Sequence, residues 1–141
     1  MGAFAAAEKA RTKGVSIGAG TLLFGTLDSN VHPELITIGK GTLIASNANV
    51  LCHGSVEGWL PVTVGDYCHI GWGALILPGA VIGNNCVIGA RAVVPRARPI
   101  PDNSVAVGNP ATVVKQRDPE ELARFKRRME QRIKDDGTGD G

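Results

Sequence analysis

Three histidines, His32, His53 and His69, are the side chains of this 141-residue sequence best suited to move a proton at neutral pH. An imidazole has an ordinary pKa of about 6.5, so it can accept the proton that a hydroxyl loses as it attacks an acyl group. His32 and His53 stand in irregular stretches, whereas His69 ends a regular six-residue unit. The first two are therefore the stronger candidates for chemistry, and we expect His69 to be structural or interfacial.

The three cysteines form no Cys-x-x-Cys pair. Cys52 adjoins His53, but neighbours in an extended chain point to opposite faces, which disfavours a cysteine nucleophile activated by that histidine. Cys68 and Cys86 recur at the same place in two units, which favours a packing role. The sequence has no recognisable signal peptide and no apolar run long enough to cross a bilayer, so we expect a cytoplasmic protein without a membrane partner.

The charges are distributed unevenly. The formal net charge of +2 is too small to argue for a nucleic-acid partner, yet fourteen of the fifteen lysines and arginines lie outside residues 14–90. The cations that return after Ala90 could hold the phosphates of a ligand, because Arg and Lys are the usual phosphate partners. They are Arg91, Arg96, Arg98 and Lys115.

The elements that must position these residues follow a period of six. Aliphatic residues recur at this spacing without a break from Val64 to Ile100, and a small residue holds the fifth place of each unit. This period fits neither the 3.6 of an amphipathic helix nor simple strand alternation, but it fits one side of a triangular prism with three units in each coil. An α/β domain is the alternative, and no helical stretch between Gly14 and Lys115 could serve as its crossover.

Two breaks interrupt the period. The spacing from Ile17 to Ile38 is twenty-one, three more than one coil, and the spacing from Val50 to Val64 is fourteen, two more than two units. The second break predicts a small bulge within residues 52–61. Insertions in a solenoid emerge as loops and commonly form the binding face, so we expect the chemistry there.

The fold prediction is an all-β, parallel β-helix with a C-terminal α-helix. Residues 1–14 form an arm, either a helical turn or disordered; residues 15–115 form the β-helix; residues 116–135 hold the helix; and residues 136–141 form a disordered tail. Asp118 and Pro119 are typical of a helix start. An apolar stripe should pack this helix on the prism or on a neighbouring subunit; it comprises Leu122, Phe125, Met129 and Ile133.

The repeats resemble those of the hexapeptide-repeat acyltransferases, in particular the galactoside, maltose and polysaccharide O-acetyltransferases. The resemblance spans about residues 15–115, and its most specific parts are a Leu77-Pro-Gly unit, an Ile88-Gly-Ala unit and a closing Gly108-Asn-Pro-Ala. It implies a left-handed coil, a homotrimer with active sites between subunits, acetyl-CoA as donor, a small-molecule acceptor such as a sugar, and no required metal. The residue that matches the family's catalytic histidine is His53, which would act as a general base.

The resemblance also implies where acetyl-CoA lies. A backbone N–H of the Gly71-Trp72-Gly73 corner of the adjoining chain would bind the oxyanion, and the pantetheine arm would lie near Trp72 and Ala90. The nucleotide end would lie near Pro95, Arg96 and Lys115, with Arg91 as a further cation. The chain departs from the family at Pro95-Arg96, where members often have Thr-Lys.

The acceptor side is expected on the two irregular stretches, at Asn30, His32, Glu34 and Trp59. His32, with Glu34 and Asn30, could orient either the acceptor or His53. Galactoside and maltose enzymes begin with a helical segment that shapes the acceptor pocket. Only about fourteen residues precede the first unit here, so we expect a smaller or more open acceptor site.

Two other functions stay open. The γ-class carbonic anhydrases share this prism and hold zinc between subunits with three histidines, but they space two of them five residues apart, whereas His53 and His69 are sixteen apart. The third possibility is a non-catalytic scaffold or binding subunit, which CoA binding would distinguish from an enzyme.

Overall fold

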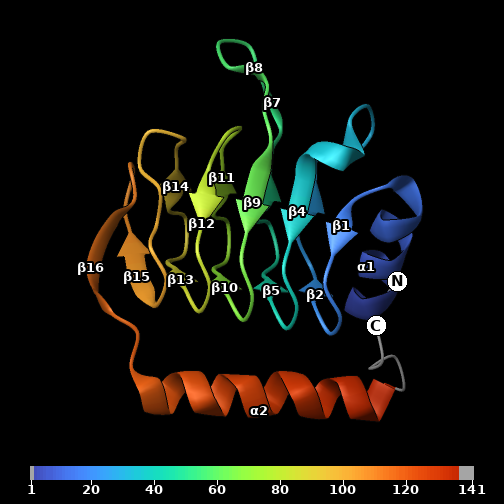
Figure 1. Ribbon diagram of the computed structural model, residues 1–141, viewed down its shortest axis with the longest axis vertical. Helices are drawn as coiled ribbons and strands as arrows, with labels where there is room; N and C mark the ends of the chain where they lie inside the picture. The colour runs from blue at the N-terminus through green and yellow to red at the C-terminus, as the bar shows by residue number, and fades with distance from the viewer. Residues whose placement is uncertain (1, 137–141) are drawn as a thin grey trace.

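A computed structural model of the protein describes residues 2–136 and has a triangular prism of short parallel strands at its centre (Figure 1). The prism is a left-handed β-helix followed by a C-terminal α-helix, which confirms the predicted fold class. We name its three faces in the order in which the chain visits them. Face A holds β1 (Ser16–Ile17), β4 (Ile36–Ile38), β9 (Val62–Val64) and β12 (Val81–Ile82).

Faces B and C complete each coil. Face B holds β2 (Leu22–Leu23), β5 (Leu43–Ile44), β10 (His69–Ile70), β13 (Val87–Ile88), β15 (Ser104–Val107) and the antiparallel β16 (Thr112–Gln116). Face C holds β3 (Thr26–Leu27), β6 (Asn49–Val50), β11 (Leu75–Ile76) and β14 (Val93–Val94). Because these strands are only two or three residues long up to β14, the chain turns a corner after almost every one of them.

The core is a set of stacked aliphatic columns, one for each face. Val64 pairs with Ile82 on face A, Ile70 with Ile88 on face B and Ile76 with Val94 on face C. All of these side chains are buried. Each aliphatic residue therefore lies on its equivalent eighteen residues away, as the period predicts.

Small residues with a donor group line one inner corner. The hydroxyls of Thr21 and Thr42 and the thiols of Cys68 and Cys86 are buried, and each donates to a backbone carbonyl of the next coil at 2.7–3.1 Å. The carbonyls belong to Gly39, Gly65, Gly83 and Pro101, in that order. The two cysteines thus have the packing role expected for them, and each thiol also donates to a carbonyl of the next coil.

The second break is larger than the sequence predicted. Val50 and Val64 lie on faces C and A, which are consecutive, so their spacing of fourteen exceeds the usual six by eight residues rather than two. The expectation of a small bulge was wrong. Counting six residues on from Val50 makes Val56 the inward-facing aliphatic residue of the next unit, but Val56 is 87% exposed. The extra residues form an antiparallel hairpin of β7 (His53–Gly54) and β8 (Gly58–Trp59).

The N-terminal segment forms an eleven-residue helix, α1 (Ala3–Lys13), at the first end of the prism. Its Ala7 and Ala10 are buried against the first coil. Arg11 donates to the carbonyls of Ile17 and Gly18 at 2.9 and 2.8 Å, and this fastens the helix to the first coil. Of the two states that the sequence left open for this segment, the structure has a helix, longer than a single turn.

The C-terminal helix α2 (Pro119–Asp136) runs along the edge between faces A and B (Figure 1). Phe125 and Met129 of its apolar stripe are buried against Leu22. Asp136 belongs to this helix, and the rest of the predicted tail lies outside the described residues. Within residues 2–136, no helix is both long enough and apolar enough to cross a membrane.

Candidate active site

Both irregular stretches leave the prism at the edge between faces C and A, which we call the loop edge. The first insertion, residues 28–35, contains a 3₁₀ turn, η1 (Pro33–Leu35), and the second carries the β7–β8 hairpin. In Figure 1 both project from the same side of the prism, and α2 lies on the opposite side. Residues twenty apart in sequence are therefore neighbours at this edge.

The hairpin is fastened to the prism at its base. The backbone N–H of Leu60 donates to the Cys52 carbonyl at 2.9 Å, and the Cys52 thiol donates to the Asp28 carbonyl at 3.2 Å. An ideal Cβ built on Gly79 would lie 3.2 Å from Leu60, so the hairpin also rests on the next coil. These contacts hold the two insertions together just below His53.

Four residues of the two insertions form an aromatic and ionic chain, which we call the histidine brace. His53 and Trp59 are partners across the hairpin, with ring centroids 4.2 Å apart and an interplanar angle of 32°. His32 meets Trp59 edge to face, with centroids 4.6 Å apart at 81°. Nδ1 of His32 lies 3.0 Å from a carboxylate oxygen of Glu34. A hydrogen bond from its own backbone N–H, followed by the contact with His32, lowers the pKa of Glu34.

His53 itself is exposed, and no side chain or backbone group among the described residues forms a hydrogen bond with its ring. Its imidazole is therefore free to meet a substrate, and its ring contact is with Trp59. The predicted general base thus stands at a solvent-facing edge, as the chemistry requires.

Cys52 is buried on the other side of the strand from His53. Burial raises the pKa of its thiol, and the nearby Asp28 carboxylate raises it further. A buried thiol that is harder to ionise is a poor nucleophile. This agrees with the expectation from the sequence.

His69 lies apart from the other two histidines. Its ring stacks on Phe125 of α2, with centroids 5.8 Å apart at 14°. Burial, followed by the charge of Arg117, lowers its pKa. His69 is thus covered by the C-terminal helix, and in the described part of the chain no three histidine, cysteine or acidic side chains gather in a way that could hold a metal.

The residues expected to hold the pantetheine arm lie at a second edge, between faces B and C. Trp72 is 45% exposed there, and the Arg91 guanidinium lies 5.1 Å from the centre of its ring. The Arg91 backbone N–H donates to the Trp72 carbonyl at 2.8 Å, because the two corners stack. A Cβ on Gly71 would lie 2.7 Å from the Ala90 nitrogen, so glycine is needed there for the coils to approach.

The residues expected near the nucleotide are divided between two places. Pro95 and Arg96 lie at the loop edge, where Arg96 stacks on the Gly79 corner. Lys115 lies on β16, opposite Val105, and is exposed. Within one chain, the brace and Arg96 therefore lie on the same edge of the prism, whereas Trp72 and Arg91 lie on another edge.

Sequence reasoning gave no role to two carboxylates beside the brace. Asp28 approaches the Cys52 thiol, and the Glu57 carboxylate lies directly against Gly54 of the hairpin. The only signal for them was their position in the two insertions. Asn30, which was expected to contact the acceptor, is exposed on the first insertion.

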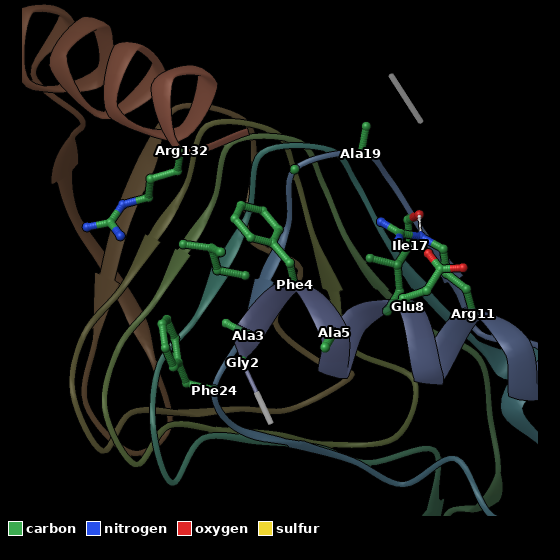
Figure 2. Close-up of a pocket in the computed structure, with 12 residues that line it drawn as sticks. Gly2, Ala3, Phe4, Ala5, Glu8, Arg11, Ile17, Ala19, Phe24 and Arg132 are labelled. Atoms are coloured by element: carbon green, nitrogen blue, oxygen red, sulfur yellow. Dashed lines mark hydrogen bonds and ion pairs between the residues drawn. The ribbon is translucent and has the colours of Figure 1, made fainter. Parts of the chain in front are cut away.

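A cavity of about 1130 Å³ lies elsewhere, between α1, the first coil and the end of α2. Figure 2 shows Phe4 and Phe24 on its apolar wall, with the Glu8–Arg11 ion pair and Arg132 at its margin. Its lining includes none of the three histidines. The candidate active site therefore lies at the loop edge and not in this cavity.

A left-handed prism of six-residue units with an exposed histidine on an inserted loop defines a class of β-helix proteins. The sequence pattern described as "Bacterial transferase hexapeptide (six repeats)" matches residues 61–96. Over these residues the chain is similar to the hexapeptide-repeat family, and over a longer stretch it is similar to O-acetyltransferases.

Three relatives illustrate the similarity. Galactoside O-acetyltransferase of Escherichia coli is 36% identical over 100 residues, which cover 61% of this chain and 46% of that protein. A maltose O-acetyltransferase from Clostridium difficile 630 has a TM-score of 0.57 at 30% identity, over 74% of this chain and 59% of that one. A galactoside acetyltransferase in complex with coenzyme A has a TM-score of 0.58 at 28% identity, over 76% and 57%. The chain thus spans about half the length of the curated relatives it matches.

Proposed function

We propose that the protein is an acyltransferase that moves an acetyl group from acetyl-CoA to a hydroxyl or amine of a small molecule. The observation that carries this proposal is the exposed imidazole of His53, which stands at the loop edge of a hexapeptide-repeat prism. The similarity to acetyltransferases, one of them in complex with coenzyme A, supports the choice of donor.

In the proposed reaction, His53 takes the proton from the acceptor as its oxygen or nitrogen attacks the thioester carbonyl. The tetrahedral intermediate collapses with cleavage of the carbon–sulfur bond, and the imidazolium returns the proton to the CoA sulfur. A positioned base of this kind contributes roughly a hundred- to ten-thousandfold to the rate. No covalent acyl-enzyme is needed, which agrees with the buried Cys52.

The proposed assembly is a homotrimer with a site between neighbouring chains. Such an assembly is supported by the division of the candidate residues between two edges of one prism. In a trimer, the Trp72 edge of one chain would face the loop edge of the next. A backbone N–H of residues 71–73 would then bind the oxyanion across the interface.

For the donor, we propose that the pantetheine arm lies along Trp72 and Ala90 and that the phosphates meet basic residues. Arg91, Arg96 and Lys115 are all exposed, so their charges are available to a ligand. The three cysteines are free and buried, which is compatible with a reducing cytoplasm.

For the acceptor, we propose a site bordered by the two insertions. Asn30, Glu34 and Trp59 are exposed there, and His32 is half-buried. A sugar ring is one acceptor that this border would suit, because an aromatic face and carboxylates offer apolar contact and hydrogen bonds.

The test is a thiol-release assay with acetyl-CoA over a panel of sugars, amino sugars and other small hydroxyl compounds. We expect free CoA with at least one acceptor, and a loss of at least about a hundredfold in the His53→Ala variant. Ser55→Ala, an exposed change in the same hairpin, is the matched control. Light scattering checks that both variants keep the assembly of the unmodified protein.

Two results would count against the proposal. Full activity of His53→Ala would remove the base from its role. Failure of the unmodified protein to bind acetyl-CoA in calorimetry would favour a scaffold instead.

A further inference from the structure

We propose that Trp59 is the positioning residue of His53, and that His32 and Glu34 act through it. This inference rests on the proposed function, because it concerns the base of that reaction. In this proposal the indole ring orients the imidazole, as a hydrogen-bonded carboxylate does for many catalytic histidines.

The orientation of the His53 ring depends on contacts other than hydrogen bonds. A ring that serves as a base must be held in one orientation, and a misplacement of about 1 Å can cost roughly a hundredfold in rate. Among the described residues, no group forms a hydrogen bond with the His53 ring, although Glu34 and Glu57 both lie in the same two insertions. The Glu34 carboxylate is directed to His32 instead.

The His53 ring packs against the Trp59 indole. Its ring lies 4.2 Å from that of Trp59, centroid to centroid, and the two residues are register partners in the hairpin. Aromatic pairs at this distance contribute about 0.5–1.5 kcal/mol beyond the burial of their surface. A hairpin of two strands with two residues each is marginal on its own, so this pair is a substantial part of what orders it.

Trp59 in turn contacts a residue of the first insertion. His32 packs against the indole edge to face, at 4.6 Å and 81°, and the ion pair with Glu34 fixes the orientation of His32. His32 belongs to the first insertion, so the brace ties the hairpin to a part of the loop edge that the chain reaches twenty residues earlier. The order of action is therefore Glu34, His32, Trp59 and finally His53.

The proposed order predicts which kinetic parameter changes when the brace is lost. Loss of the brace should lower kcat, because the base is misplaced, and it should leave the KM for acetyl-CoA nearly unchanged, because Trp72 and Arg91 lie at another edge. We expect Trp59→Leu, which has no aromatic ring, to lower kcat by about ten- to a hundredfold. Trp59→Phe keeps an aromatic face and should stay within about threefold of the unmodified protein.

A double-mutant cycle tests whether His32 acts through the indole. His32→Ala should lower kcat in the unmodified protein but have almost no further effect in the Trp59→Leu background. Additive effects of the two changes would overturn the proposed order. Val56→Ala, at the exposed tip of the hairpin, is the control for disturbance of the loop and should change neither kcat nor the KM for acetyl-CoA.

A second measurement does not depend on activity. In the NMR spectrum, the indole ring current should displace the His53 ring protons, and Trp59→Leu should return them to ordinary positions while Trp59→Phe retains part of the displacement. Unchanged His53 signals in Trp59→Leu would overturn the inference. By contrast, a displaced signal in a protein that releases no CoA would contradict the proposed function and leave the brace intact.

Discussion

His53 and Trp59 face each other across the β7–β8 hairpin, with ring centroids 4.2 Å apart and five residues between them in sequence. The contact exists because residues 51–61 turn back on themselves instead of continuing the coil. One insertion therefore supplies both the candidate base and the aromatic ring beside it. The prism contributes a rigid edge from which this hairpin projects.

Arg91 should bind the donor, so its removal should weaken acetyl-CoA binding without altering chemistry. We expect Arg91→Ala to raise the KM for acetyl-CoA by roughly tenfold, with kcat nearly unchanged, because the variant loses an exposed cation that we propose pairs with a phosphate. Steady-state kinetics at two salt concentrations provide the measurement. Arg127→Ala removes the same charge from the outer side of α2 and should leave this KM as it is.

Arg117 should stabilise the packing of α2 on the prism. Its buried guanidinium donates to the Glu121 carboxylate and to the Tyr67 carbonyl, both at 2.7 Å, and lies 4.7 Å from the Phe125 ring. Arg117→Met keeps the apolar stem and removes these bonds, so the free energy of unfolding should fall by about 2 kcal/mol. Urea unfolding measures the loss.

The control for this change is Arg124→Met, which replaces an exposed arginine within α2 itself and should alter the free energy of unfolding by less than about 0.5 kcal/mol. Equal stability of the two variants would show that the buried guanidinium does not hold α2 in place.

His69 should make stability depend on pH. Burial and then Arg117 lower its pKa in the folded protein, so the unfolded chain binds the proton more tightly than the folded one. Stability should therefore decline as the pH falls below the ordinary histidine pKa of about 6.5. The groups that face His69 are Arg117, Arg128 and Glu121, and of these only Glu121 favours its protonation.

Thermal unfolding between about pH 7 and pH 5 checks this expectation. His69→Gln cannot take up the proton and should show a flatter dependence in that range. The lowered pKa values of Glu34 and Glu121 act separately, because the stability they contribute is lost only as the pH falls below about 4.5. A slope for His69→Gln equal to that of the unmodified protein would contradict the assignment.

Much of the fold could be predicted because the six-residue period is a local property of the chain. Each six-residue unit has an aliphatic residue such as Ile82, then a glycine, and later a small residue such as Cys86. Each of these places in the unit corresponds to one position on the prism. The C-terminal helix was predictable for a similar reason, since Asp118, Pro119 and the apolar stripe are all local signals. The position of His53 in an irregular stretch was also visible.

The size of the second insertion was not predictable from the period alone. The spacing of fourteen from Val50 to Val64 fits either two units and a bulge or one corner and a hairpin, and only the pairing of Val50 with Ile76 decides between them. The sequence could not show that Glu34 would pair with His32 rather than with His53, because the direction of a side chain depends on contacts between insertions twenty residues apart.

The sequence by itself thus determined the prism, its terminal helix and the candidate base, because each depends on residues close together in the chain. The tertiary structure alone decided that both insertions leave the same edge, that Trp59 stands between two histidines and that Trp72 and Arg91 lie at another edge. Those relationships depend on how one coil stacks on the next and on which face each strand occupies, and no short stretch of sequence contains that information.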